Sequence, residues 1–137
     1  MKILLDTHAL VWWWTDDARL PAPARAAIAM PGNIVLVSSV TAWEIATKHR
    51  IGKWPDVATI VNGFDAHLRR SRFAGLPISI GHAHLAGSLD GRHRDPFDRM
   101  LIAQSLQEDV PLVSGDAVFA SYGATVIWDQ PLLAGWA

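Results

Sequence analysis

Residues 3–8 read Ile3-Leu4-Leu5-Asp6-Thr7-His8, an apolar run that ends abruptly in polar residues. Three further short apolar runs follow, at residues 34–37, 112–113 and 125–128, each bounded by turn or polar residues. Such runs are typical of short buried strands. Helical patterns separate the second run from the third, and strands alternating with helices favour a parallel sheet covered on both faces. We therefore expect an α/β protein, a three-layer α/β/α sandwich with a central, mainly parallel sheet.

Four helices are predicted around this sheet, besides a first helix that contains residues 9–14. Apolar residues recur at helical spacing from Val57 to Leu68, which predicts one helix after Trp54-Pro55. Another begins at Asp95-Pro96, because proline suits the first helical position, and is bounded by Pro111. A third follows Ser38-Ser39 and ends near Gly52, and residues 81–89 form a fourth.

Length and composition limit the possible classes of protein. The 137 residues fit one domain, 1–137. Half of the residues are hydrophobic and 18% are charged, which predicts a folded core. The net charge of -1 argues against a protein that binds nucleic acid through uniform positive charge. The lack of cysteine excludes disulfides, zinc ribbons and thiol catalysis, and it fits a reducing cytoplasm.

Neither an export signal nor a membrane span is predicted. Asp6 and His8 interrupt the first apolar run before a signal core could form. The longest apolar run, residues 9–14, is far shorter than the roughly 18 residues that span a bilayer. We expect a soluble, cytoplasmic protein with no membrane partner.

Acidic residues stand just beyond the predicted strands or near helix starts: Asp6, Glu44, Asp98 and Asp116. Helix capping explains each one singly, since Asp6 and Asp116 suit N-caps, and both Thr41 with Glu44 and Asp95 with Asp98 have capping-box spacing. Capping does not require all four to lie at one end of the sheet. Carboxyl ends of parallel strands do meet at one crevice, which predicts a shared site there.

Electrostatics indicates what such a site would bind. Two like charges 4 Å apart repel by about 4 kcal/mol at an effective dielectric near 20, so a cluster of carboxylates needs a neutralising partner. An oxygen-only ligand set suits a hard cation, Mg²⁺ or Mn²⁺. Such an ion acidifies a bound water for attack on phosphorus, so the inferred chemistry is phosphodiester hydrolysis.

Basic and hydroxyl side chains near these acids are candidate phosphate ligands. Arg92, Arg94 and Arg99 surround Asp98, and Lys48, Arg50 and Lys53 follow Glu44. An ordinary solvated face explains the basic residues equally well. Thr7 and Ser114 suit a phosphate oxygen or a metal-bound water, with local backbone capping as the alternative. His8 has a substrate contact and a structural role as alternatives, and the spacing of His82 and His84 argues against a zinc site.

Four segments, in this order, resemble the PIN domain nucleases, and among them the VapC-type toxins of toxin–antitoxin modules. The segments are Leu4-Leu5-Asp6-Thr7-His8, Ser38-Ser39-Val40-Thr41-Ala42-Trp43-Glu44-Ile45, Arg94-Asp95-Pro96-Phe97-Asp98-Arg99 through Gln104, and Leu112-Val113-Ser114-Gly115-Asp116. The resemblance covers nearly the whole chain.

The resemblance implies a Mg²⁺- or Mn²⁺-dependent ribonuclease. Asp6 and Asp98 would be the principal metal ligands, Asp116 would complete the site, and Glu44 would hold a second metal or orient the nucleophile. Thr7, Ser114, Arg94 and Arg99 would contact substrate. Asp95 competes with Asp98 for its role, and Ser114 stands where many relatives carry threonine.

The resemblance also implies partners: an RNA substrate, a cognate antitoxin whose tail lies across the groove, a homodimer and a higher toxin–antitoxin complex. The six apolar residues 9–14 of the predicted first helix, which include Trp12, Trp13 and Trp14, cover more than a full turn and cannot all face one core. We therefore expect one of these tryptophans in a dimer or antitoxin contact. A helix covered on all sides by its own domain is the alternative. For the chain as a whole, the alternative function is a non-catalytic PIN-like protein-interaction module. A phosphatase with a second aspartate two residues after the first is improbable, because that position is His8.

Overall fold

A five-stranded parallel sheet organises the described part of the chain. The computed structural model describes residues 1–130, so residues 131–137 of the predicted domain lie outside it. In chain order the elements are β1 (Lys2–Leu5), α1 (Thr7–Trp14), α2 (Ala22–Ala29), β2 (Ile34–Ser38), α3 (Ser39–Arg50), the 3-10 helix η1 (Pro55–Val57), α4 (Ala58–Val61), α5 (Phe64–Ser71), β3 (Ala74–Leu76), α6 (Ile80–Ser88), α7 (Pro96–Glu108), β4 (Leu112–Val113), α8 (Ala117–Ser121) and β5 (Val126–Ile127). The strand order is β3-β2-β1-β4-β5, with every pairing parallel. The α/β prediction is confirmed.

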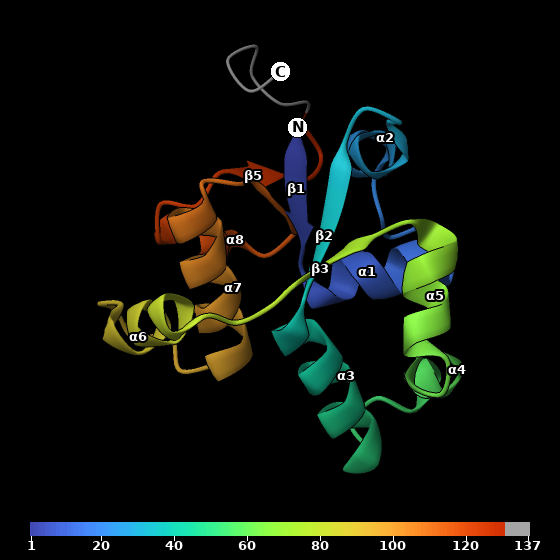
Figure 1. Ribbon diagram of the computed structural model, residues 1–137, viewed down its shortest axis with the longest axis horizontal. Helices are drawn as coiled ribbons and strands as arrows, with labels where there is room; N and C mark the ends of the chain where they lie inside the picture. Colours follow the sequence, from blue (N-terminus) through green and yellow to red (C-terminus); the bar gives the residue numbers. More distant parts are fainter. Residues whose placement is uncertain (131–137) are drawn as a thin grey trace.

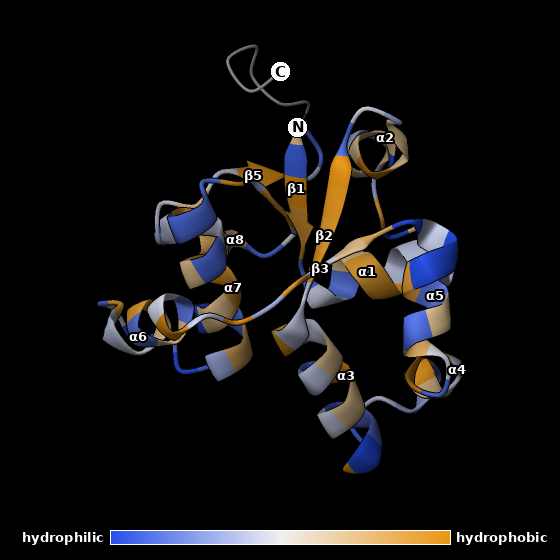
Figure 2. Cartoon of the chain, in the orientation of Figure 1, coloured by the Kyte–Doolittle hydropathy of each residue, from blue (hydrophilic) through white to orange (hydrophobic). Residues whose placement is uncertain are grey.

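Helices cover the sheet on two sides. Figure 1 shows α7 and α8 on one side of β1 and β2 and α1, α2, α4 and α5 on the other, with α3 extending from the end of β2. Alternate strand residues supply two separate cores. Ile3 and Leu5 pack with α1 and α2, whereas Leu4 packs with Leu101 and Ile102 of α7. The strands therefore lie as an apolar layer between more polar helices (Figure 2).

The structure differs from the sequence-based expectation at several elements, among them the short helix α8, which was not predicted. β3 and α2 were not predicted, because Ala74–Leu76 is short and largely exposed and Ala22–Ala29 buries only two residues. The single helix expected from Val57 to Leu68 is three pieces, η1, α4 and α5. The break falls at Asn62-Gly63, where Gly63 takes a non-helical conformation before α5.

The three consecutive tryptophans of α1 pack mainly within the molecule. Trp12, Trp13 and Trp14 are partly buried against the core on the α1 side. Trp14 also donates a hydrogen bond from Nε1 to Ser71 Oγ, 2.7 Å away, and stacks on Phe73. Covering by the chain's own elements therefore accounts for much of this apolar run.

The position of β1 in the sheet decides where a site can form. The chain passes from β1 to β2 on one side, and β4 joins β1 on the other. The carboxyl ends of β1 and β4 therefore meet at a topological switch point, where open α/β sheets bind ligands. Among the described helices, none is long and apolar enough to cross a bilayer.

Candidate active site

A pocket of about 190 Å³ lies at this switch point. Its lining residues are Asp6, Thr7, His8, Glu44, Lys48, Asp95, Asp98, Asp116 and Phe119. All four predicted catalytic carboxylates are therefore in one place, together with Asp95 and a single lysine. The predicted substrate residue Thr7 lines the same pocket.

Asp6 follows β1 directly and begins α1. Its Oδ1 accepts a hydrogen bond from the backbone N–H of Ala9 at 2.7 Å, so the expected N-cap is present. Only 6% of Asp6 is exposed. Burial raises the pKa of this carboxyl to about 7, against hydrogen bonds from Ser114 and Ala9 that lower it, and the charges of Asp98 and Glu44 raise it further. Asp6 therefore both caps α1 and lines the pocket.

Glu44 enters the pocket from the middle of α3. Its Oε1 accepts a hydrogen bond from the Thr7 hydroxyl at 2.5 Å, and its Oε2 pairs with Lys48 one turn later. The capping-box reading of Thr41 with Glu44 is wrong, because Ser38 caps α3 and both residues lie inside the helix. Glu44 is 97% buried inside the helix and caps neither of its ends. Its contacts with Thr7 and Lys48 therefore stabilise the buried carboxylate.

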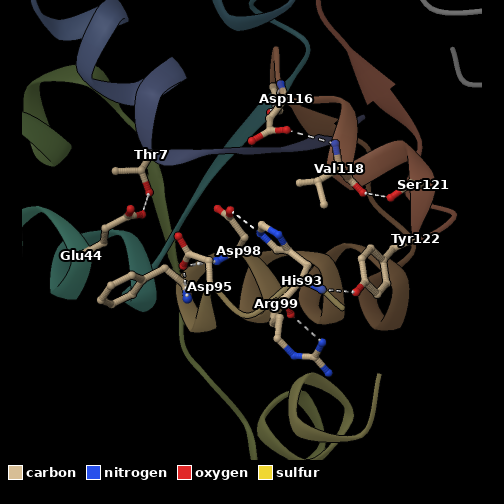
Figure 3. Close-up of polar contacts among 12 residues, drawn as sticks. Thr7, Glu44, His93, Asp95, Asp98, Arg99, Asp116, Val118, Ser121 and Tyr122 are labelled. Atoms are coloured by element: carbon tan, nitrogen blue, oxygen red, sulfur yellow. Dashed lines mark hydrogen bonds and ion pairs between the residues drawn. The ribbon is translucent and has the colours of Figure 1, made fainter. Parts of the chain in front are cut away.

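The sequence left open whether Asp95 or Asp98 takes the acidic role in the site, and the structure gives the two residues different contacts. Asp95 caps α7, accepting hydrogen bonds from the N–H groups of Phe97 and Asp98. Asp98 is directed toward His93, whose Nε2 lies 2.8 Å from its Oδ2 (Figure 3). Burial raises the pKa of Asp98, the hydrogen bond from His93 lowers it, and the charges of Asp95 and Glu44 raise it.

Asp116 approaches the pocket from the loop after β4. Its Oδ1 caps α8 through the N–H of Val118, and its own N–H donates to Ser114 Oγ at 3.0 Å. Ser114 is 1% exposed and lies behind the pocket, where its hydroxyl links the backbone of Asp116 to the carboxylate of Asp6. These contacts favour a positioning role for Ser114, and direct contact with substrate stays a prediction.

The two predicted phosphate-binding arginines lie outside the pocket. Arg99 donates to the backbone carbonyls of Ala86, Leu89 and His93, so its guanidinium holds the loop between α6 and α7. Arg94 is exposed and lines a neighbouring hollow of about 770 Å³ with Arg92 and His93. Arg99 lines this hollow too, but its donors already have partners. Contact of Arg94 with a phosphate stays a prediction.

The pocket suits a divalent cation in the chemistry of its donors. Five carboxylates line it with Thr7, His8 and one lysine, so oxygen donors dominate and negative charge is in excess. In their present conformations, however, no three acidic or imidazole side chains of residues 1–130 form a group that could hold an ion. Figure 3 shows Asp98 turned to His93 and Glu44 turned to Thr7, and Glu44 also pairs with Lys48.

Sequence reasoning missed His93 as a residue of the site. It lies in an irregular loop, five positions before Asp98, and neither periodicity nor a capping pattern marks it. Its backbone N–H donates to the Tyr122 hydroxyl at 3.3 Å, which links it to the end of α8. Only the neighbouring carboxylates of the segment 94–99 could have drawn attention to it.

One curated relative is similar to part of this chain in sequence. Ribonuclease VapC16 of Mycobacterium tuberculosis is 36% identical over 62 residues, which are 45% of this chain and 43% of that protein. The aligned part therefore spans less than half of that relative.

Solved structures show the same fold. VapBC2 from Rickettsia felis bound to a DNA fragment from their promoter has a TM-score of 0.67 at 17% identity, covering 92% of this chain and 97% of that chain. VapBC-1 from nontypeable Haemophilus influenzae has a TM-score of 0.67 at 14% identity, covering 96% and 98%. The family model described as the PIN domain matches residues 3–124, which include every acidic residue of the pocket. The chain therefore belongs to the PIN domain family.

Proposed function

We propose that this chain is a Mg²⁺- or Mn²⁺-dependent endoribonuclease and the toxin of a toxin–antitoxin module. One observation carries the nuclease proposal: Asp6, Glu44, Asp98 and Asp116 line one pocket at the switch point of a parallel sheet. Support for RNA as the substrate comes from the name of the relative, a ribonuclease, and support for an antitoxin partner comes from the VapBC complexes that share the fold.

In this proposal Asp6, Asp98 and Asp116 hold the metal, and Glu44 holds a second ion or orients the attacking water. The ion supplies Lewis acidity for in-line attack on phosphorus and offsets charge on the phosphate oxygens. Ser114 keeps the Asp6 carboxylate in position from behind the pocket, and Thr7 does so for Glu44. Lys48 balances part of the charge, and Arg94 contacts a phosphate at the rim.

We further propose one domain, residues 1–137, which acts in the cytoplasm as a homodimer and in a higher complex with the antitoxin. All described strands belong to one sheet, which supports the single domain. The VapBC structures support an antitoxin partner.

The experiment is cleavage of a mixed cellular RNA pool by purified protein with Mn²⁺, with Mg²⁺ and with EDTA. Asp6→Asn and Asp98→Asn are the test variants. Asp109→Asn is the matched control, because that exposed aspartate stands at the far end of α7. Discrete fragments that disappear with EDTA and with both test variants support the proposal. No cleavage by folded protein with either metal would overturn it in favour of the non-catalytic interaction module.

A further inference from the structure

Aromatic side chains form a continuous band beside the acidic pocket. We call Trp54, His8, Trp12 and Trp128 the aromatic band. The ring centroids of His8 and Trp54 are 5.1 Å apart, those of His8 and Trp12 are 5.5 Å apart, and those of Trp12 and Trp128 are 5.8 Å apart. These residues come from the loop after α3, from α1 and from the end of β5. The fold, rather than a local sequence pattern, therefore brings them together.

His8 is the member that joins the band to the pocket. It lines the pocket with Asp6 and Thr7, yet its side chain is exposed to solvent. Two tilted indoles brace the imidazole, so its orientation is set before any ligand arrives. A ligand whose phosphate occupied the pocket would meet this ring first on the α1 side.

The position of the band beside the pocket suits a nucleic-acid strand. Bases stack on aromatic faces, so a nucleotide whose phosphate lay in the pocket would place its base against the band. The two cations nearest the band are already paired, Arg19 with Asp17 and Lys48 with Glu44, so the flat rings rather than free charge carry the recognition.

We infer that the aromatic band is a base-binding subsite in which an unpaired nucleobase next to the scissile phosphate packs against His8 and Trp54. The inference rests on the proposed nuclease function and adds to it the side chains that would receive the base beside the cleaved phosphate. Sequence-specific RNA recognition generally uses such unstacked bases. Paired bases are already stacked on one another and would not reach the band.

The test is fluorescence of a single-stranded RNA pentamer with one 2-aminopurine between uridines, titrated with the full chain carrying Asp98→Asn to prevent cleavage. Stacking on the band is expected to quench the fluorescence. The same label within a duplex is expected to show no protein-dependent change. Absence of quenching with the single strand would overturn the base-binding subsite and leave the band as a protein-contact surface.

Variants locate the effect. His8→Ala in the same protein is expected to raise the Kd for the pentamer roughly 5- to 100-fold, the range for loss of one stacked base. His8→Phe keeps a flat ring and is expected to retain most of the affinity. The matched control is His84→Ala, an exposed histidine on α6 away from the pocket.

Cleavage assays in Mn²⁺, with residue 98 left as aspartate, separate this inference from the proposed function. Cleavage with a raised KM and a nearly unchanged kcat in His8→Ala supports both. Cleavage with an unchanged KM in His8→Ala overturns the subsite alone. No cleavage, but quenching that depends on His8, overturns the nuclease proposal while the base-binding subsite stands.

Discussion

Nε2 of His93 lies 2.8 Å from Oδ2 of Asp98, so a ring from the loop before α7 holds a carboxylate of that helix's first turn. The contact favours the ionised carboxylate, because hydrogen bonding by His93 lowers the pKa of Asp98 against the effect of burial. His93 thus joins Thr7, Lys48 and Ser114 as a residue outside the acidic set that contacts one of its carboxylates directly.

His93→Ala is expected to raise the pKa of Asp98, because the opposing hydrogen bond is lost while burial remains. The acidic limb of the pH–rate profile for RNA cleavage should then move to higher pH. His93→Gln, which keeps an N–H donor, should move it less. His84→Ala is the control. If the acidic limb of the pH–rate profile does not move in His93→Ala, this role of His93 is contradicted.

Asp6→Asn is expected to stabilise the metal-free protein at neutral and alkaline pH. The carboxyl pKa of Asp6 is about 7 in the folded state and 3.8 in its unperturbed state, so the folded protein favours the protonated form. The stabilisation that the protonated Asp6 gives the folded protein is complete below about pH 4 and is lost as the pH rises through 7. Asparagine avoids this loss, which is on the order of 4 kcal/mol at most.

The measurement is Tm in EDTA at several pH values between 4 and 8. The difference between Asp6→Asn and the unsubstituted chain should grow with pH, and Asp109→Asn should show no such trend. Mn²⁺ should then stabilise the unsubstituted chain more than Asp6→Asn. A difference that is level across pH would refute the explanation by burial.

Lys48→Met should lower the free energy of unfolding by about 1–3 kcal/mol, because Glu44 loses its charged partner in a buried position. Methionine keeps the apolar stem. The double variant Glu44→Gln with Lys48→Met should recover part of the loss, and exposed Lys53→Met is the control. Urea denaturation checks this, and equal losses in the single and double variants would argue against the pairing.

Gly115→Ala should disturb the pocket through Trp128. A Cβ at this position would lie 2.6 Å from Cε2 of the indole ring, which has little freedom to yield. Overpacking of this kind costs about 1–3 kcal/mol, and the loop that carries Asp116 would shift with it. RNA cleavage and Tm should both fall. Gly87→Ala is the control, because Gly87 lies in a helix with open space where a Cβ would stand, and its Tm should rise slightly. A similar rise in Gly115→Ala would contradict the prediction.

Arg99→Gln and Arg94→Gln should have opposite signatures. Arg99→Gln removes hydrogen bonds to three carbonyls and should lower the free energy of unfolding by about 2 kcal/mol. Exposed Arg94→Gln should leave stability unchanged and raise the KM for RNA a few-fold, because one phosphate contact is lost. Chemical denaturation and steady-state kinetics measure the two effects. Equal stability of both variants would remove the structural role given to Arg99.

The sheet was predictable where apolar runs are buried on both faces. Leu4 and Leu5, in neighbouring positions, serve two different cores, and this demands the continuous apolar run that the sequence shows. β3 lacks this signal because it is an exposed edge strand of three residues, and its place depends on pairing with β2. The break at Gly63 also escaped the periodic pattern, since the apolar spacing continues across it.

The acidic set was predictable because Asp6 and Asp116 follow strands and Asp98 lies in the first turn of a helix. Glu44 lies inside the helix that follows β2, and the parallel sheet brings these positions together. The surroundings of these acids were not predictable. The Thr7 to Glu44 contact joins residues 37 positions apart, and the His93 and Trp54 side chains enter from loops. Arg99 lies next to Asp98 in sequence, yet successive helix residues point about 100° apart, so its side chain reaches the α6–α7 loop.

The central place of β1 has a consequence for synthesis of the chain on the ribosome. β1 is made first, but its neighbour β4 and the adjoining Ser114 and Asp116 come more than a hundred residues later. Until then one edge of β1 has no parallel partner, and the acidic pocket lacks a wall. A nascent chain that ends before these residues therefore has no complete site, and the pocket forms only after β4, Asp116 and α8 have been translated.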